Sequence, residues 1–169
     1  GLTRPAAGTI SWDDGAVSDD PVRHHGRLHF VGHQDAVKPV LSVRENLTLW
    51  TRLRGGTEDG LATGLERFGL TELADIPGRY LSAGQRRRLS LARVSATPAP
   101  LWLLDEPTVA LDRDSVAALS RAIADHRASG GMVVVATNVD LDLADYSSLD
   151  LSDFAAAGDL SEASGLVAS

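Results

Sequence analysis

The chain has 169 residues with a formal net charge of −7, and 43% of its residues are hydrophobic. This composition is typical of one globular domain, and the acidic balance argues against a nucleic-acid-binding protein, which usually carries a basic patch. The sequence has no cysteine, which excludes disulfides and thiolate metal sites, and no apolar run approaches the ~20 residues of a membrane span.

The N-terminal part is predicted to hold a hairpin and one strand. The chain begins at Gly1 with neither an initiator methionine nor a signal peptide, which suggests a fragment of a longer protein or a processed chain. Residues 9–12 form a β-like run that Asp13-Asp14-Gly15 would close as a hairpin turn, and residues 18–23 are expected to be a loop. Residues 28–32 predict a strand.

Helices are predicted in the middle of the chain. Ser42 followed by Glu45 has the form of a capping box, and the helix that it starts is expected to end at the glycine pair after residue 54. Ser82 is the expected N-cap of a later helix. Shorter helices are predicted over residues 57–68 and 71–75, so a helical subdomain is expected over about residues 42–96.

Two apolar runs, residues 101–104 and 132–136, predict strands that are buried on both faces. Residues 112–127 lie between them and have the apolar periodicity of an amphipathic helix. Strand, helix and strand in this order imply a parallel crossover, so the sequence predicts an α/β fold with a parallel core sheet. Residues 149–151 are expected to add a last short strand.

Two adjacent carboxylates, Asp105 and Glu106, follow the first of these buried strands. Ligands bind at the carboxyl ends of parallel strands, and an Asp there can hold Mg²⁺ beside nucleotide phosphates. The next carboxylate can polarise a water for attack on a γ-phosphate. The alternative is a solvated acidic pair at the end of a strand.

A second candidate site lies at the helix that Ser82 caps. Ser82 and Gly84 at a helix start would expose backbone N–H groups and the positive end of the helix dipole, which together favour anion binding. The alternative is an ordinary helix cap followed by a solvated face made by Arg86, Arg87 and Arg88.

These segments together resemble the ABC ATPases. Residues 81–85 resemble the LSGGQ signature motif, with Ala83 at its third place, and residues 101–105 resemble the Walker B strand. Glu106 matches the catalytic glutamate, residues 110–112 the D-loop, Gln34 the Q-loop glutamine, and residues 5–10 the segment after the Walker A helix. The resemblance implies a partial P-loop NTPase fold over residues 1–154, with a helical signature subdomain and a separate tail over residues 155–169.

Within the ABC ATPases, the chain most resembles the CcmA family, the ATP-binding subunits of the haem exporter of cytochrome c maturation. The segments that carry this resemblance are residues 32–35, 38–42, 45–47, 81–89 and 98–107. It implies ATP and Mg²⁺ as ligands, an integral membrane permease subunit as partner, and a peripheral location on the cytoplasmic face of the inner membrane. Residues 34–53 would contact that permease. The alternative for this stretch is a helical subdomain that only packs on the core.

The resemblance also implies a role for each matching residue. Asp105 and Gln34 would hold Mg²⁺, and Glu106, Gln34 and Asn138 would be the catalytic residues of the chain's own ATP site. In this family two ATPase domains pair head-to-tail, with each nucleotide between them. The residues that would bind the nucleotide of the second domain are Ser82, Ala83, Gly84, Gln85 and Asp112.

Two departures from the family pattern affect the expected activity. No Walker A loop is present, and the only lysine, Lys38, follows Gln34 and cannot be the phosphate lysine, so that loop is expected upstream of Gly1. Asn138 stands where the family has a switch histidine, and an amide cannot carry a charge. The chain alone is therefore not expected to hydrolyse ATP at its own site, although it could complete the site of an intact partner.

Three hypotheses follow from these features. The favoured one is an N-terminally truncated ATPase of the haem exporter. The second is a degenerate, non-catalytic subunit that only completes a partner's ATP site, as Asn138 suggests. The third is an ABC ATPase of another branch, in which the acidic balance speaks against the nucleic-acid-linked members.

Overall fold

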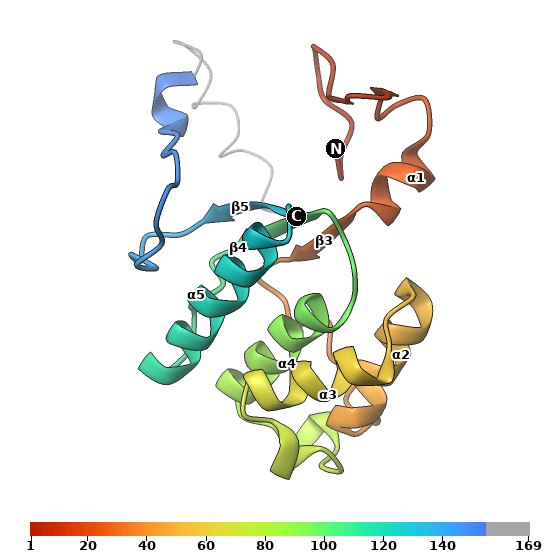
Figure 1. Ribbon diagram of the computed structural model, residues 1–169, viewed down its shortest axis with the longest axis vertical. Helices are drawn as coiled ribbons and strands as arrows, with labels where there is room; N and C mark the ends of the chain where they lie inside the picture. Colours follow the sequence, from red (N-terminus) through yellow and green to blue (C-terminus); the bar gives the residue numbers. More distant parts are fainter. Residues whose placement is uncertain (155–169) are drawn as a thin grey trace, which may run out of the picture.

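The computed structural model describes residues 1–154, and its centre is a three-stranded parallel sheet with the order β3–β4–β5 (Figure 1). The strands are β3 (Leu28–Val31), β4 (Leu101–Asp105) and β5 (Met132–Ala136), at the predicted places. The register pairs Val31 with Leu104 and Asp105 with Ala136, so the carboxyl ends of all three strands lie at one edge of the sheet.

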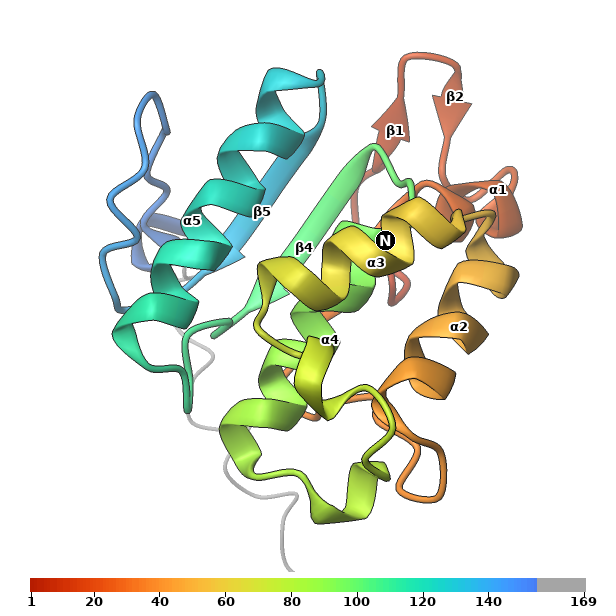
Figure 2. The same ribbon diagram turned by 60° about the horizontal axis from the view of Figure 1, so that its bottom comes forward.

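Three helices gather beside the sheet, and their capping residues explain where they begin and end (Figure 2). They are α2 (Val43–Arg54), α3 (Glu58–Arg67) and α4 (Ala83–Ala96). The expected capping box of Ser42 and Glu45 starts α2, and Gly55 ends it in the left-handed conformation at φ 71°. Leucines at helical spacing, among them Leu47, Leu61, Leu65 and Leu91, form the core that holds these helices together.

The remaining long helix, α5 (Arg113–Ala128), connects β4 to β5 and packs on one face of the sheet. Its buried side chains include Leu119 and Ile123, which join Trp102 and Leu104 of β4 in the same hydrophobic core. The predicted parallel pairing of two strands around this helix is therefore confirmed.

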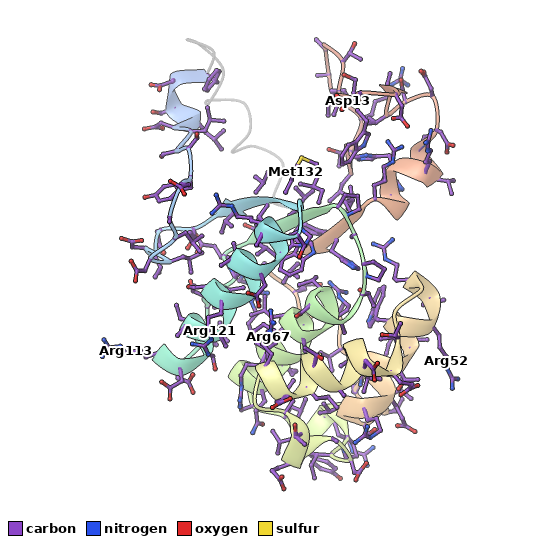
Figure 3. The ribbon with its side chains drawn as sticks, viewed as in Figure 1. Asp13, Arg52, Arg67, Arg113, Arg121 and Met132 are labelled. Atoms are coloured by element: carbon purple, nitrogen blue, oxygen red, sulfur yellow. The ribbon has the colours of Figure 1, made fainter. Side chains whose placement is uncertain are left out.

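The opposite face of the sheet is open in the described residues, so the prediction of a strand buried on both faces is wrong for β5, because no described element covers its second face. Phe30 and Val134 pair across the sheet with Leu103, which places all three on that face, and the two are 45% and 60% exposed. Met132 projects from the same side, away from α5 (Figure 3). Within residues 1–154, β5 is bonded to β4 alone, so its other edge is free.

The structure also departs from the prediction in four short segments. Residues 18–23 are not simply a loop: Asp20 caps α1 (Pro21–Gly26), and Pro21 suits a first helical position. The predicted hairpin forms, but its strands, β1 (Ser11–Trp12) and β2 (Gly15–Ala16), have only two residues each.

The predicted helix over residues 71–75 is a single 3₁₀ turn, η1 (Thr71–Leu73), and another turn, η2 (Gly78–Tyr80), precedes α4. No strand forms at residues 149–151, because no described strand lies there to pair with it, and η3 (Leu151–Phe154) forms instead. The predicted tail over residues 155–169 lies outside the described residues. None of the described helices has the length and apolar character required to cross a membrane.

Candidate functional site

The polar residues predicted to act on a nucleotide meet at the carboxyl edge of the sheet. Asp105 ends β4 and Glu106 follows it, while Gln34 and Asn138 lie in the segments that leave β3 and β5. The backbone N–H of Glu106 donates to the carbonyl oxygen of Ala136 over 2.8 Å, which ties the ends of β4 and β5 together. Gln34 and Asn138 are exposed, and Asp105 and Glu106 are half-buried, so all four remain accessible.

Glu106 has an unusual backbone conformation. Its φ is +44°, in the left-handed region that side-chain-bearing residues rarely adopt, and the next residues in the turn, Pro107 and Thr108, are buried. A residue held in this region costs on the order of 1–3 kcal/mol and persists only where its surroundings enforce it. The turn after β4 is thus strained, and it holds the half-buried Glu106 directly before the buried residues Pro107 and Thr108.

The N-terminus of α4 forms the second part of the candidate site. The hydroxyl of Ser82 accepts from the backbone N–H of Gln85 at 3.2 Å, and the Gln85 side chain accepts from the backbone N–H of Ser82 at 2.8 Å. Ser82 and Ala83 are exposed, so the positive end of the helix dipole faces solvent. This arrangement suits an anion such as a nucleotide phosphate.

Gly84 joins this helix start to the turn before α5. A Cβ added at Gly84 would stand 2.6 Å from the carbonyl oxygen of Ala110, so only glycine allows this approach. Asp112 then caps α5 by accepting from the backbone N–H of Ser115 at 2.8 Å. Hydrogen bonds from the Ser115 hydroxyl and backbone lower the pKa of Asp112, which keeps it ionised beside the helix N-terminus.

The donor chemistry of the sheet edge fits a magnesium ion bound with phosphate. Mg²⁺ in nucleotide sites takes one or two carboxylates, and phosphate oxygens and waters complete its octahedron. Asp105 and Gln34 offer one carboxylate and one amide oxygen at this edge. Among the described residues no group of three His, Cys, Asp or Glu side chains could hold a metal by itself.

Two residues that reasoning from the sequence missed hold these segments in place. Arg87 was expected at most on a solvated face, but it is 3% exposed and bonds to the backbone on both sides of the candidate site. Asn46 of α2 is buried and bonds to the loop after Gln34, through Lys38, Leu41 and Ser42. In the sequence, the place of Asn46 four residues after the N-cap Ser42 is the only signal for its contacts with this loop.

The chain is similar to several known proteins. A family model described as ABC transporter matches residues 1–109. The cytochrome c biogenesis ATP-binding export protein CcmA of Rhodospirillum rubrum is 55% identical over 165 residues, which are 98% of this chain and 70% of that protein. The protein of the same name from Paramagnetospirillum magneticum is 49% identical over 164 residues, covering 95% of this chain and 76% of that protein.

Solved structures show the same fold. A dimeric structure of a post-hydrolysis state of the ATP-binding cassette MJ0796, bound to ADP and Pi, superposes with a TM-score of 0.71 and 26% sequence identity. The superposition covers 82% of this chain and 66% of that one, so the chain spans slightly less than two thirds of the cassette.

Proposed function

The chain belongs to the ABC transporter family, among the CcmA-type ATP-binding proteins, and from this premise we propose that it is part of the ATP-hydrolysing subunit of a haem exporter. The likeness to solved cassettes confirms the predicted partial P-loop NTPase fold. The observation that carries the proposal is that Gln34, Glu106 and Asn138 lie in the segments that leave three paired parallel strands at the same edge of the sheet.

We assign the chemistry of the chain's own site to these residues. Asp105 and Gln34 would hold Mg²⁺, which would neutralise phosphate charge when bound. The Glu106 carboxylate orients the attacking water and accepts its proton, and the Asn138 amide donates a hydrogen bond to the γ-phosphate. Ser82 and Ala83 at the N-terminus of α4 are exposed, and with Gly84 they supply phosphate contacts to the nucleotide of a second ATPase domain.

The open face of the sheet indicates where the phosphate-binding loop would pack. No glycine-rich loop with a lysine occurs in the 169 residues. Phe30, Met132 and Val134 leave an apolar surface exposed, and the free edge of β5 has unpaired backbone groups among the described residues. We infer that the strand and helix of a phosphate-binding loop pair with this edge and cover this face.

The loop and helix after Gln34 are proposed to contact the membrane permease. Val40 and Leu53 are 74% and 67% exposed there, and Asn46 donates to the carbonyl oxygens of Lys38 and Leu41 on either side of Val40. This contact would place the subunit on the cytoplasmic face of the inner membrane. Haem itself would be bound by the permease.

Reconstitution of the full-length protein with its permease in proteoliposomes tests the proposal. We expect ATP hydrolysis that requires both subunits and that haem alters. A complex that turns over ATP with no response to haem would point to another cargo and contradict the haem assignment.

A second function is favoured by one observation, Asn138 in place of the switch histidine. In that case the chain would donate only the α4 N-terminus to a partner's ATP site. A full-length protein that binds ATP but does not hydrolyse it, and that restores activity to a separate ATPase subunit, would favour this function over the first.

A further inference from the structure

Arg87 of α4 is buried between the helices and the sheet, and all five of its N–H donors are used. Its Nη2 donates to the carbonyl oxygens of Asp105 and Glu106, both at 2.7 Å, and its Nε donates to that of Pro107 at 3.2 Å. Its Nη1 donates to the carbonyl oxygen of Gly32 at 2.7 Å and to the carboxylate of Asp35 at 3.3 Å. One side chain therefore bonds to both segments that leave the sheet beside the candidate site.

The first three acceptors are consecutive carbonyl groups of the strained turn after β4. Glu106 sits at φ +44° in the middle of that turn, so its side-chain direction depends on contacts that hold the backbone there. A guanidinium presents its donors in a rigid planar fork, so it fixes the positions of several acceptors at once. Within residues 1–154, Arg87 is the side chain that donates these three hydrogen bonds to the turn.

The other two acceptors flank Gln34. Gly32 precedes it by two residues and Asp35 follows it directly, so Arg87 holds the Gln34 segment from both sides. Asp35 is the only acidic partner of Arg87 among the described residues, and the remaining charge is compensated by carbonyl oxygens. A buried cation is tolerated only when it is fully hydrogen-bonded in this way. Replacing Arg87 by a side chain with fewer N–H donors should therefore disturb both segments.

We propose that Arg87 is a positioning residue for ATP hydrolysis, which sets Glu106 and Gln34 relative to each other and to the helix that begins at Ser82. Arg87 is too deeply buried to touch a nucleotide, and it acts only through the backbone of these two segments. The inference rests on the proposed ATPase function. It predicts that losing the fork disturbs the chemical step more than nucleotide binding.

The test replaces Arg87 by lysine, which keeps the charge but has no planar fork. Arg88→Lys is the matched control: Arg88 is the next residue of α4, and its Nη1 donates to the carbonyl oxygens of Phe68 and Gly69, away from the strand ends. Both variants are made in the full-length protein with its permease. The measurements are kcat and KM for ATP, the melting temperature, and amide hydrogen exchange of the segments around Gln34 and Glu106.

We expect Arg87→Lys to lower kcat about 10²-fold, the effect of a small misplacement of reacting groups, while KM for ATP changes by less than about twofold. Hydrogen exchange should rise at both segments in Arg87→Lys and at neither in Arg88→Lys, whose kcat should stay close to that of the wild type. If both variants lose kcat in proportion to melting temperature, or if exchange rises equally in both, Arg87 has only a structural role and the proposal is wrong.

Failure of the proposed function is a separate result. A wild-type complex without ATPase activity would overturn that function, while hydrogen exchange would still decide whether Arg87 holds the two segments. If Arg87→Lys does not fold, Asp35→Asn removes only the charged partner. It should lower kcat about threefold at constant KM, and an unchanged kcat would contradict the proposal.

Discussion

The carbonyl oxygen of Ala110 lies against Gly84, at 2.6 Å from the position that a Cβ on residue 84 would take. This contact joins the N-terminus of α4 to the turn that precedes α5. The two segments that would bind a partner's nucleotide therefore form one surface, and the contact depends on the absence of a single methyl group.

Gly84→Ala is expected to destabilise the full-length protein and to weaken its activity. The new Cβ meets a backbone oxygen that cannot rotate away, and overpacking of this kind costs about 1–3 kcal/mol. Urea unfolding measures the loss. Gly26→Ala is the control, because a Cβ there meets no atom within 4 Å, and it should be neutral. Equal stability of the two variants would show that the contact is not close in solution.

His29 is expected to make folding stability depend on pH. It is 2% exposed in β3, and burial, followed by the charges of Arg54 and Arg93, lowers its pKa from 6.5 to about 4. The unfolded chain binds a proton at this histidine more readily than the folded chain does. The contribution of neutral His29 to the free energy of unfolding is therefore fully present above pH 6.5 and is lost as the pH falls toward 4. This contribution is about 3 kcal/mol.

The measurement is urea unfolding of the full-length protein between pH 4 and 7. His29→Gln cannot titrate, so its stability should fall less steeply over this range than that of the wild type. His33→Gln is the control, because His33 is exposed, and its profile should follow the wild type. Parallel profiles for all three proteins would contradict the burial of a neutral His29.

Asn138→His is expected to raise ATP hydrolysis by the full-length complex. The substitution restores the residue that the family resemblance places at this position, and it adds a donor that can carry a charge near neutral pH. We expect kcat to rise about tenfold and to become sensitive to pH between about 6 and 8. Asn138→Ala should lower kcat. If both variants match the wild type, residue 138 has no part in turnover.

Local signals predicted most of the fold. The capping box at Ser42 and Glu45 and the N-cap at Ser82 begin helices as expected, because a cap is decided by residues within one turn. The apolar runs at residues 101–104 and 132–136 formed strands as predicted, because an apolar run this short favours a strand over a helix. The helix α1 was missed even though Asp20 and Pro21 are a cap and a first helical residue, because the run around them is short and polar.

The candidate site was predictable where it depends on strand order, and not where it depends on distant contacts. Asp105 and Asn138 follow parallel strands, so their approach at one sheet edge could be expected from the sequence. Arg87 could not be identified in that way. Four of its partners are backbone carbonyl oxygens, which every residue has, and they lie far along the chain from α4.

The rate of phosphate release by the Glu106→Gln variant tests the central claim most directly. It is measured in the full-length protein with its permease, with Glu66→Gln on the exposed surface of α3 as the control. Loss of the general base should lower kcat about 10²- to 10⁴-fold, while ATP binding and the control variant stay close to the wild type. A Glu106→Gln variant that hydrolyses ATP at the wild-type rate would contradict the placement of an ATP site at the carboxyl edge of β4.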